Sequence, residues 1–242
     1  LGDELFRQLQ CTRALQLTEQ LIAEPSVTPL DGRCQALIAA HLMPLGFACE
    51  TLVSGPDDFC VTNLWAIRRS ARTHAPTLVL AGHTDVVPTG PLEQWQSDPF
   101  VPTHRDGKLY GRGASDMKTS LAAMVVAVEE FLQACPQPAF HIGFLLTSDE
   151  EGPALDGTTI VCQALKQRGE RLDWCIVGEP TGMKVVRAHK GKRSYYCRVR
   201  GFEAHSSLTP RGVNAIEYAA EIILKLKEMG KCHRDGGPYD DE

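Results

Sequence analysis

Strand-like and helix-like stretches alternate along the chain up to about residue 180, and this alternation limits the possible folds. Five stretches have the length and composition of strands: 47–53, 61–67, 77–81, 140–146 and 174–177. Four stretches carry apolar residues at helical intervals: 15–23, 33–45, 118–134 and 158–166. Strand alternating with helix predicts an α/β fold with a mostly parallel sheet flanked by helices. In such sheets, ligand-binding residues follow the carboxyl ends of the strands.

Two parts of the chain depart from this alternation. Residues 88–112 are rich in Pro, Gly and Trp and are expected to form a long loop. After Pro180, paired strands are expected at 185–189 and 195–199, and a helix at 214–229. The polar, glycine-rich end is expected to be disordered. The expected division is a first domain over 15–180, the beginning of a smaller α+β domain over 181–230, and two tails, 1–14 and 231–242.

Composition excludes several classes of protein. A net charge of −5 over 242 residues argues against a general nucleic-acid binder, which is normally basic. No apolar stretch approaches the roughly 18–20 residues that a membrane-spanning helix needs, and the first residues are amphipathic rather than signal-like. The nine cysteines include no CxxC pair, which fits a reducing compartment better than a disulfide framework. A cytoplasmic protein without nucleic-acid or membrane partners is expected.

Four acidic segments follow the predicted strands or lie close to them. They are Gly82-His83-Thr84-Asp85, Ser115-Asp116-Met117-Lys118, Ser148-Asp149-Glu150-Glu151 and Gly178-Glu179-Pro180. One imidazole and several carboxylates, supplied by successive loops, are what a pair of divalent metal ions requires. Each segment has an ordinary structural interpretation when taken alone. Their ordered series favours metal binding.

The first segment pairs a ligand with a partner that can orient it. His83 and Asp85 lie two residues apart at the end of a strand, so in an extended backbone their side chains point the same way. A neutral imidazole is a good zinc ligand, and a carboxylate two residues on is well placed to accept the other ring N–H. The alternative is a capping or turn motif.

The other segments supply carboxylates. Asp116 precedes a predicted helix, where it is either a helix N-cap or, with glycines around it, a carboxylate that bridges two cations. Adjacent Glu150 and Glu151 point in different directions, so one can bind metal while the other serves as general base; the alternative is a solvated acidic loop. Glu179 follows a buried strand and is the weakest signal of the series.

The motifs HTDVVP, GRGASDMK, TSDEEGPA and VGEP, in this order and spacing, resemble those of the M20 family of dinuclear zinc amidohydrolases. Over residues 15–180 the resemblance is to succinyl-diaminopimelate desuccinylases, through stretches such as SVTPLDGRCQ, VTNLWAIR and AGHTDVVPTGPLEQWQSDPF. After residue 181, the stretch TGMKVVRAHKGKRSYYCRVRGFEAHSSLTPRG is more similar to acetylornithine deacetylases. The resemblance implies a zinc-peptidase-like catalytic domain followed by part of a lid and dimerisation domain.

The resemblance also implies a role for each residue that matches a motif. His83 and Glu179 would bind one zinc and Glu151 the other, with Asp116 as the bridge between them. Asp85 would orient His83. Glu150 would act as general base and then donate the proton to the leaving amine. His205 matches a lid histidine that binds the substrate carbonyl oxygen, often across a dimer interface; its alternative is an ordinary turn histidine.

The implied reaction is hydrolysis of a small N-acyl amino acid with two Zn²⁺ ions, although cobalt or manganese also suits such ligands. The expected substrate is N-succinyl-LL-2,6-diaminopimelate, which gives succinate and LL-diaminopimelate for lysine and cell-wall biosynthesis. Acetylornithine deacetylation for arginine biosynthesis, a metallo-aminopeptidase relative and a catalytically incomplete fragment remain open. Eight basic residues between Lys184 and Arg211 suit a dicarboxylate substrate but also an ordinary solvated sheet face.

The family pattern also continues beyond the residues present here. A last histidine ligand for the second zinc has no match, and His233, in the polar tail, is not assigned that role. The expectation is a chain that binds one zinc better than two and hydrolyses poorly. A homodimer is typical of the complete family.

Overall fold

The computed structural model describes residues 2–188, 191 and 194–236. In the first helix only the side chains from residue 12 onward are described, and in the last helix only those up to residue 232. It divides into two compact units, one reaching to Val185 and the other beginning at Val186. Each unit is described by itself. Within the described residues, no helix is long and apolar enough to cross a membrane.

The first unit is built on a five-stranded sheet in the order β1-β2-β6-β3-β7. Its strands are β1 (Ala48–Ser54), β2 (Val61–Arg68), β3 (Thr77–His83), β6 (His141–Thr147) and β7 (Trp174–Val177). The pairs β3–β6 and β3–β7 are parallel, whereas β1–β2 and β2–β6 are antiparallel. The α/β class is confirmed, but the sheet is mixed rather than mostly parallel. For β1 and β2 the reason is local: a short connection joins them, whereas parallel neighbours need a longer crossover, usually a helix.

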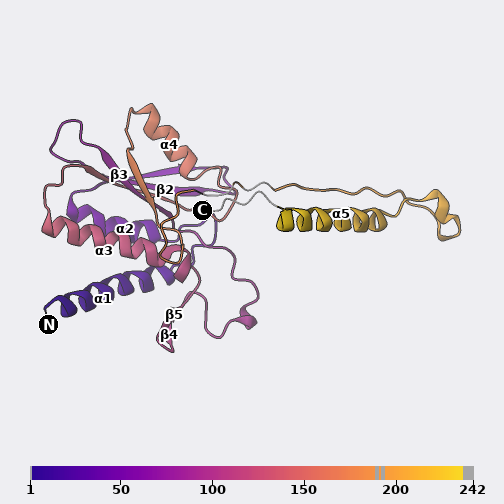
Figure 1. Cartoon of the computed structure of the whole chain (residues 1–242), viewed down its shortest axis with the longest axis horizontal. Coiled ribbons are helices and arrows are strands. Elements are labelled where there is room, and N and C mark those ends of the chain that lie inside the picture. Colours follow the sequence, from indigo (N-terminus) through magenta and orange to yellow (C-terminus); the bar gives the residue numbers. More distant parts are fainter. Residues whose placement is uncertain (1, 189–190, 192–193, 237–242) are drawn as a thin grey trace. The chain divides into compact units, whose positions relative to one another are not determined.

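Helices cover both faces of this sheet (Figure 1). On one side lie α1 (Gly2–Ile22), α2 (Cys34–Leu42) and α3 (Thr119–Ala134), and on the other lies α4 (Thr158–Gln167). Strand β6 is apolar without alternation because both of its faces are buried. Phe144 packs with residues of α1–α3, while Leu145 packs with Val161 of α4. A strand buried on both faces is expected to read as a continuous apolar run.

Two differences from the expected elements lie in the first unit. Helix α1 begins at Gly2, earlier than the helix expected from residue 15, so most of the segment 1–14 is helical. The expected loop 88–112 contains a short hairpin of β4 (Thr103–Arg105) and β5 (Lys108–Tyr110). Asp106 and Gly107 both have positive φ in its two-residue turn, and an Asp-Gly pair is a strong signal for this kind of turn.

The second unit departs further from expectation. No strand forms at the expected positions 185–189 and 195–199 among the residues described there, and His189 lies outside them. An isolated two-stranded pair is marginally stable in water, which explains the difference. Helix α5 spans Ala215–Gly236, so residues 231–236 are helical rather than disordered, and 237–242 lie outside the described residues.

Lys118 ties the end of α1 to the turn that precedes α3. Its side chain is fully buried, and its Nζ donates to the carbonyl oxygens of Leu21 at 2.7 Å and Glu24 at 2.9 Å. These carbonyls lie at the carboxyl end of α1, where a cation is favoured and where oxygens otherwise lack partners.

Substituting Lys118→Met is therefore expected to lower the free energy of unfolding by about 1–3 kcal/mol, because buried carbonyls lose their donor. Chemical denaturation followed by circular dichroism measures this change. Lys166→Met, on the exposed face of α4, is the matched control and should change stability little. Equal stabilities of the two variants would show that the buried ammonium group does not tie the two helices together.

Candidate metal centre

Three neighbouring strands end at one edge of the sheet, and each supplies a candidate site residue there, either as its last residue or shortly after it. His83 is the last residue of β3, Glu150 and Glu151 follow β6, and Glu179 follows β7. Because β3 pairs in parallel with both neighbours, all three carboxyl ends lie at the same edge. The strand-end rule used on the sequence thus brings these four residues together.

Asp116 reaches the same edge from a different kind of element. It lies in one π-helical turn, Ala114–Lys118, that precedes α3, and its own backbone is non-helical (φ −125°, ψ 100°). The preceding Gly113 has φ +79°, a conformation that favours glycine. Asp116 Oδ1 lies 3.0 Å from His83 Nε2, and the residue at the N-cap of α3 is Lys118. Asp116 is therefore not the N-cap of α3, and its bridging role stays a prediction.

The ligand atoms cluster around one ring nitrogen. From His83 Nε2, the distances are 3.0 Å to Asp116, 3.6 Å to Glu179 and 3.8 Å to Glu150. Donor atoms bound at about 2.0–2.2 Å to a tetrahedral zinc lie about 3.4 Å from one another, so this spacing fits a metal ion. Two overlapping groups have all donor atoms within 4.8 Å: His83, Asp116, Glu179 and His83, Glu150, Glu151.

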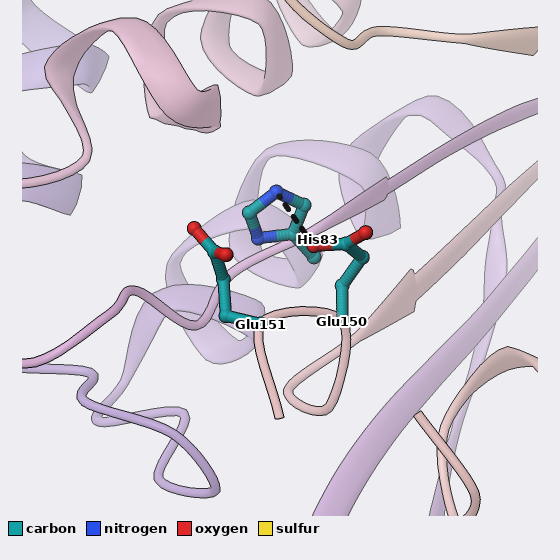
Figure 2. Close-up of side chains that lie close together, drawn as sticks. All are labelled: His83, Glu150 and Glu151. Carbon is teal, nitrogen blue, oxygen red and sulfur yellow. Dashed lines mark ion pairs between the residues drawn. The ribbon is translucent and has the colours of Figure 1, made fainter. Parts of the chain in front are cut away.

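Burial is unequal across this cluster. His83 is fully buried, whereas the side chains of Asp116, Glu150 and Glu179 are 50%, 52% and 36% exposed. Figure 2 shows the imidazole between Glu150 and Glu151, with an ion pair drawn to Glu150. The centre is thus anchored on its inner side and accessible on its outer side, as a catalytic metal site with an open position requires.

The second ring nitrogen of His83 has a backbone partner. Nδ1 donates to the backbone carbonyl oxygen of Asp85 at 2.9 Å, and the Asp85 carboxylate oxygen Oδ1 lies farther away, at 3.5 Å. This fixes the orientation of the ring and turns Nε2 toward the carboxylates. Asp85 was expected to orient His83 with its carboxylate; the nearest acceptor is its main chain.

The Asp85 carboxylate accepts hydrogen bonds from two other segments of the chain. Its Oδ2 accepts hydrogen bonds from the Thr28 hydroxyl at 2.6 Å and from the Glu151 amide at 3.1 Å, and the Glu150 amide lies 3.3 Å from both oxygens. Burial opposes charge on this group, but hydrogen bonds from His83 and Thr28 hold the pKa of Asp85 below its ordinary value. Thr28 was missed from the sequence, where no local pattern connects it with a residue 57 positions later.

Asp149 is a second residue that was missed. It is buried, and its carboxylate accepts from the amides of Ala154 at 3.1 Å, Leu155 at 3.0 Å and Asp156 at 3.0 Å. These bonds close the loop that carries Glu150 and Glu151. The downstream Gly-Pro pair was the available turn signal.

The charges in this cluster are unbalanced. Burial opposes charge on His83, yet the hydrogen bond and negative charge of Asp85, with the charge of Glu179, raise the pKa of the imidazole to about 9. Burial, and then the charge of Asp116, raise the pKa of Glu151, and burial with the same charge raises that of Glu179. A divalent cation relieves this repulsion, so the donor set fits such an ion.

His205 belongs to the second unit. It lies at the N-cap of the 3-10 turn Ser206–Arg211, where its Nδ1 accepts from the Ser207 amide at 3.2 Å and lies 2.8 Å from the Ser207 hydroxyl. Its expected role at the substrate carbonyl stays a prediction. His233 lies within α5, and its side chain is outside the described ones.

Comparison with known proteins identifies the family. The model of Peptidase family M20/M25/M40 matches residues 79–234. The chain is 58% identical over 220 residues to a succinyl-diaminopimelate desuccinylase of Delftia acidovorans, covering 89% of this chain and 57% of that protein. It is also 58% identical over 221 residues to the enzyme of the same name from Cupriavidus necator, covering 89% of this chain and 58% of that protein. The chain thus spans less than three fifths of the length of these relatives.

Solved structures agree at the level of the fold. Human carnosine dipeptidase 1 superposes with a TM-score of 0.61 and 27% sequence identity, over 73% of this chain and 41% of that one. An M20 family metallo-carboxypeptidase from Sulfolobus solfataricus gives a TM-score of 0.55 at 21% identity, over 68% of this chain and 37% of the other. On the family match and on the identity to its relatives, this chain belongs to Peptidase family M20/M25/M40.

Proposed function

We propose that this chain carries the metal-binding part of a zinc-dependent amidohydrolase that acts on N-succinyl-LL-2,6-diaminopimelate. The observation that carries the proposal is the cluster of one imidazole and four carboxylates at a single sheet edge, in a chain 58% identical to desuccinylases. The products are succinate and LL-diaminopimelate. Matches of 220 residues necessarily extend past residue 181, which favours this substrate over acetylornithine.

The residues of the site divide into metal ligands and groups that act on the substrate or transfer the proton. His83, Asp116 and Glu179 hold one ion, and Glu151 with Asp116 holds a second. A bound divalent ion supplies the Lewis acidity that polarises the amide carbonyl and makes water more acidic. The Glu150 carboxylate accepts a proton from the attacking water and passes it to the amine nitrogen when the C–N bond breaks. His205 binds the carbonyl oxygen.

The setting follows from the same proposal. The chain acts in the cytoplasm on a small N-acyl amino acid, with Zn²⁺ as the resident ion and Co²⁺ as a functional substitute. It assembles as a homodimer through the second unit. Net charge −5 argues against nucleic acid as a partner.

A second candidate, a form that binds metal but turns over slowly, is favoured by a specific observation. Both candidate metal groups share His83, and its Nδ1 is already bonded to Asp85. One Nε2 binds one ion, so a second ion relies on carboxylates alone among the described residues. Carboxylates without an imidazole are a poorer donor set for zinc, which is suited by imidazole ligands.

Substrate assays distinguish these candidates. The zinc-loaded or cobalt-loaded chain is expected to hydrolyse N-succinyl-LL-diaminopimelate faster than N-acetylornithine or a dipeptide, measured by release of the free amine. Faster cleavage of either of the other substrates would reassign the specificity. Measurable metal binding without hydrolysis of any of them would favour the slow, incomplete form.

Metal analysis tests the ligand set. About one tightly bound zinc per chain is expected by elemental analysis after dialysis, because one imidazole serves both groups. His83→Ala should remove it, whereas Glu151→Ala, which changes only one group, should retain most of it. A His83→Ala variant that keeps its zinc would exclude this centre.

Glu150→Ala tests the general base. Hydrolysis is expected to fall by about 10²–10⁴-fold because the proton acceptor is lost, while zinc content stays close to that of the unmodified chain. Glu93→Ala, at an exposed position, serves as the control. Unchanged hydrolysis in Glu150→Ala would move the base to another residue.

A further inference from the structure

Segment 26–29 lies against two of the loops that form the metal centre. The Thr28 amide donates to the Val86 carbonyl at 3.1 Å, and the Val86 amide donates to the Ser26 carbonyl at 2.9 Å. The Ser148 hydroxyl donates to the Pro29 carbonyl at 2.7 Å. The same short segment is therefore bonded to the loop after β3 and to the loop after β6.

The side chain of Thr28 contacts both of these loops. Its hydroxyl donates to Asp85 Oδ2 at 2.6 Å, the same oxygen that accepts the Glu151 amide at 3.1 Å. Its methyl carbon Cγ2 lies beside Gly152, only 2.7 Å from where a β-carbon on that glycine would stand. Polar and apolar ends of one side chain thus hold the stretch that carries Glu150 and Glu151.

We propose that Thr28 is a positioning residue of the metal centre, which acts through the Asp85 carboxylate on the Glu150–Glu151 backbone. The hydroxyl fixes the rotation of the carboxylate, so that both of its oxygens face the two glutamate amides. Without this donor, the carboxylate turns and the two amides lose a fixed acceptor. The inference rests on the proposed function, since it assigns Thr28 to the same centre.

The hydroxyl group and the methyl group of Thr28 can be removed one at a time. Thr28→Val keeps the branched shape and the contact with Gly152 but removes the hydroxyl donor. Thr28→Ser keeps the hydroxyl and removes the methyl group. Thr103→Val, whose hydroxyl bonds only its local backbone at Val101 in an exposed hairpin, controls for loss of a threonine hydroxyl in general.

The experiment measures zinc affinity by competition with a chromophoric chelator, the visible spectrum of the cobalt-loaded chain, and kcat and KM on N-succinyl-LL-diaminopimelate. Thr28→Val is expected to lose about 10–100-fold in metal affinity or kcat, the usual effect of removing an outer partner of a ligand. Its cobalt bands should shift, its KM should change little, and its melting temperature should stay close to that of Thr28→Ser. Thr28→Ser and Thr103→Val should behave like the unmodified chain.

The outcomes distinguish a failure of the Thr28 inference from a failure of the proposed function. Metal affinity, spectrum and kcat that are unchanged in Thr28→Val overturn the inference and leave the proposed function standing. Equal losses in Thr28→Val and Thr28→Ser also overturn it, because the shape rather than the hydroxyl would then matter. An unmodified chain that takes up neither zinc nor cobalt overturns the proposed function, and the inference with it.

Discussion

The parallel pairing of β3 with both β6 and β7 decides where chemistry can occur in this chain. His83 stands opposite Thr147, and Ala81 opposite Val177, so the residues that follow β6 and β7 emerge beside the imidazole. Since side chains alternate between faces of a strand, a shift of one residue in this register would turn His83 to the opposite face. Apolar burial on both sides of β6 fixes that register, because Phe144 and Leu145 each need their own half of the core.

The centre combines an inner wall that is packed with an outer side that is open. His83 and Asp85 are both fully buried, and the second owes its stable charge to donors around it. The carboxylates nearest to Nε2 are more than a third exposed, so their mutual repulsion is screened by water until a cation arrives. Such a site is held in place by the fold while its charge is balanced only by a ligand.

Sequence patterns predicted the elements that local chemistry determines. Strands β3 and β6 read as buried because they are apolar throughout, and the acidic residues after them were identified by their position at strand ends. Thr28 was not identified, because its hydroxyl bonds to Asp85, 57 positions later, which only the folded chain brings near. The hydrogen bonds of Asp149 are local, to amides five to seven residues later, and its only signal in the sequence was the turn formed by the Gly-Pro pair. Among the described residues, no strand forms at 185–188 or 195–199 for a related reason: a local period of two does not supply a partner surface.

Adjacent glutamates can perform different tasks only if their shared backbone is held still. Glu150 and Glu151 belong to the same candidate metal group, together with His83, and their side chains alone do not say which binds metal and which moves a proton. The Asp85 carboxylate faces both of their amides, while Asp149 closes the remainder of the loop. In the proposed function, the division of roles between metal ligand and general base therefore depends on the buried acceptors behind the loop as much as on the two glutamate carboxylates themselves.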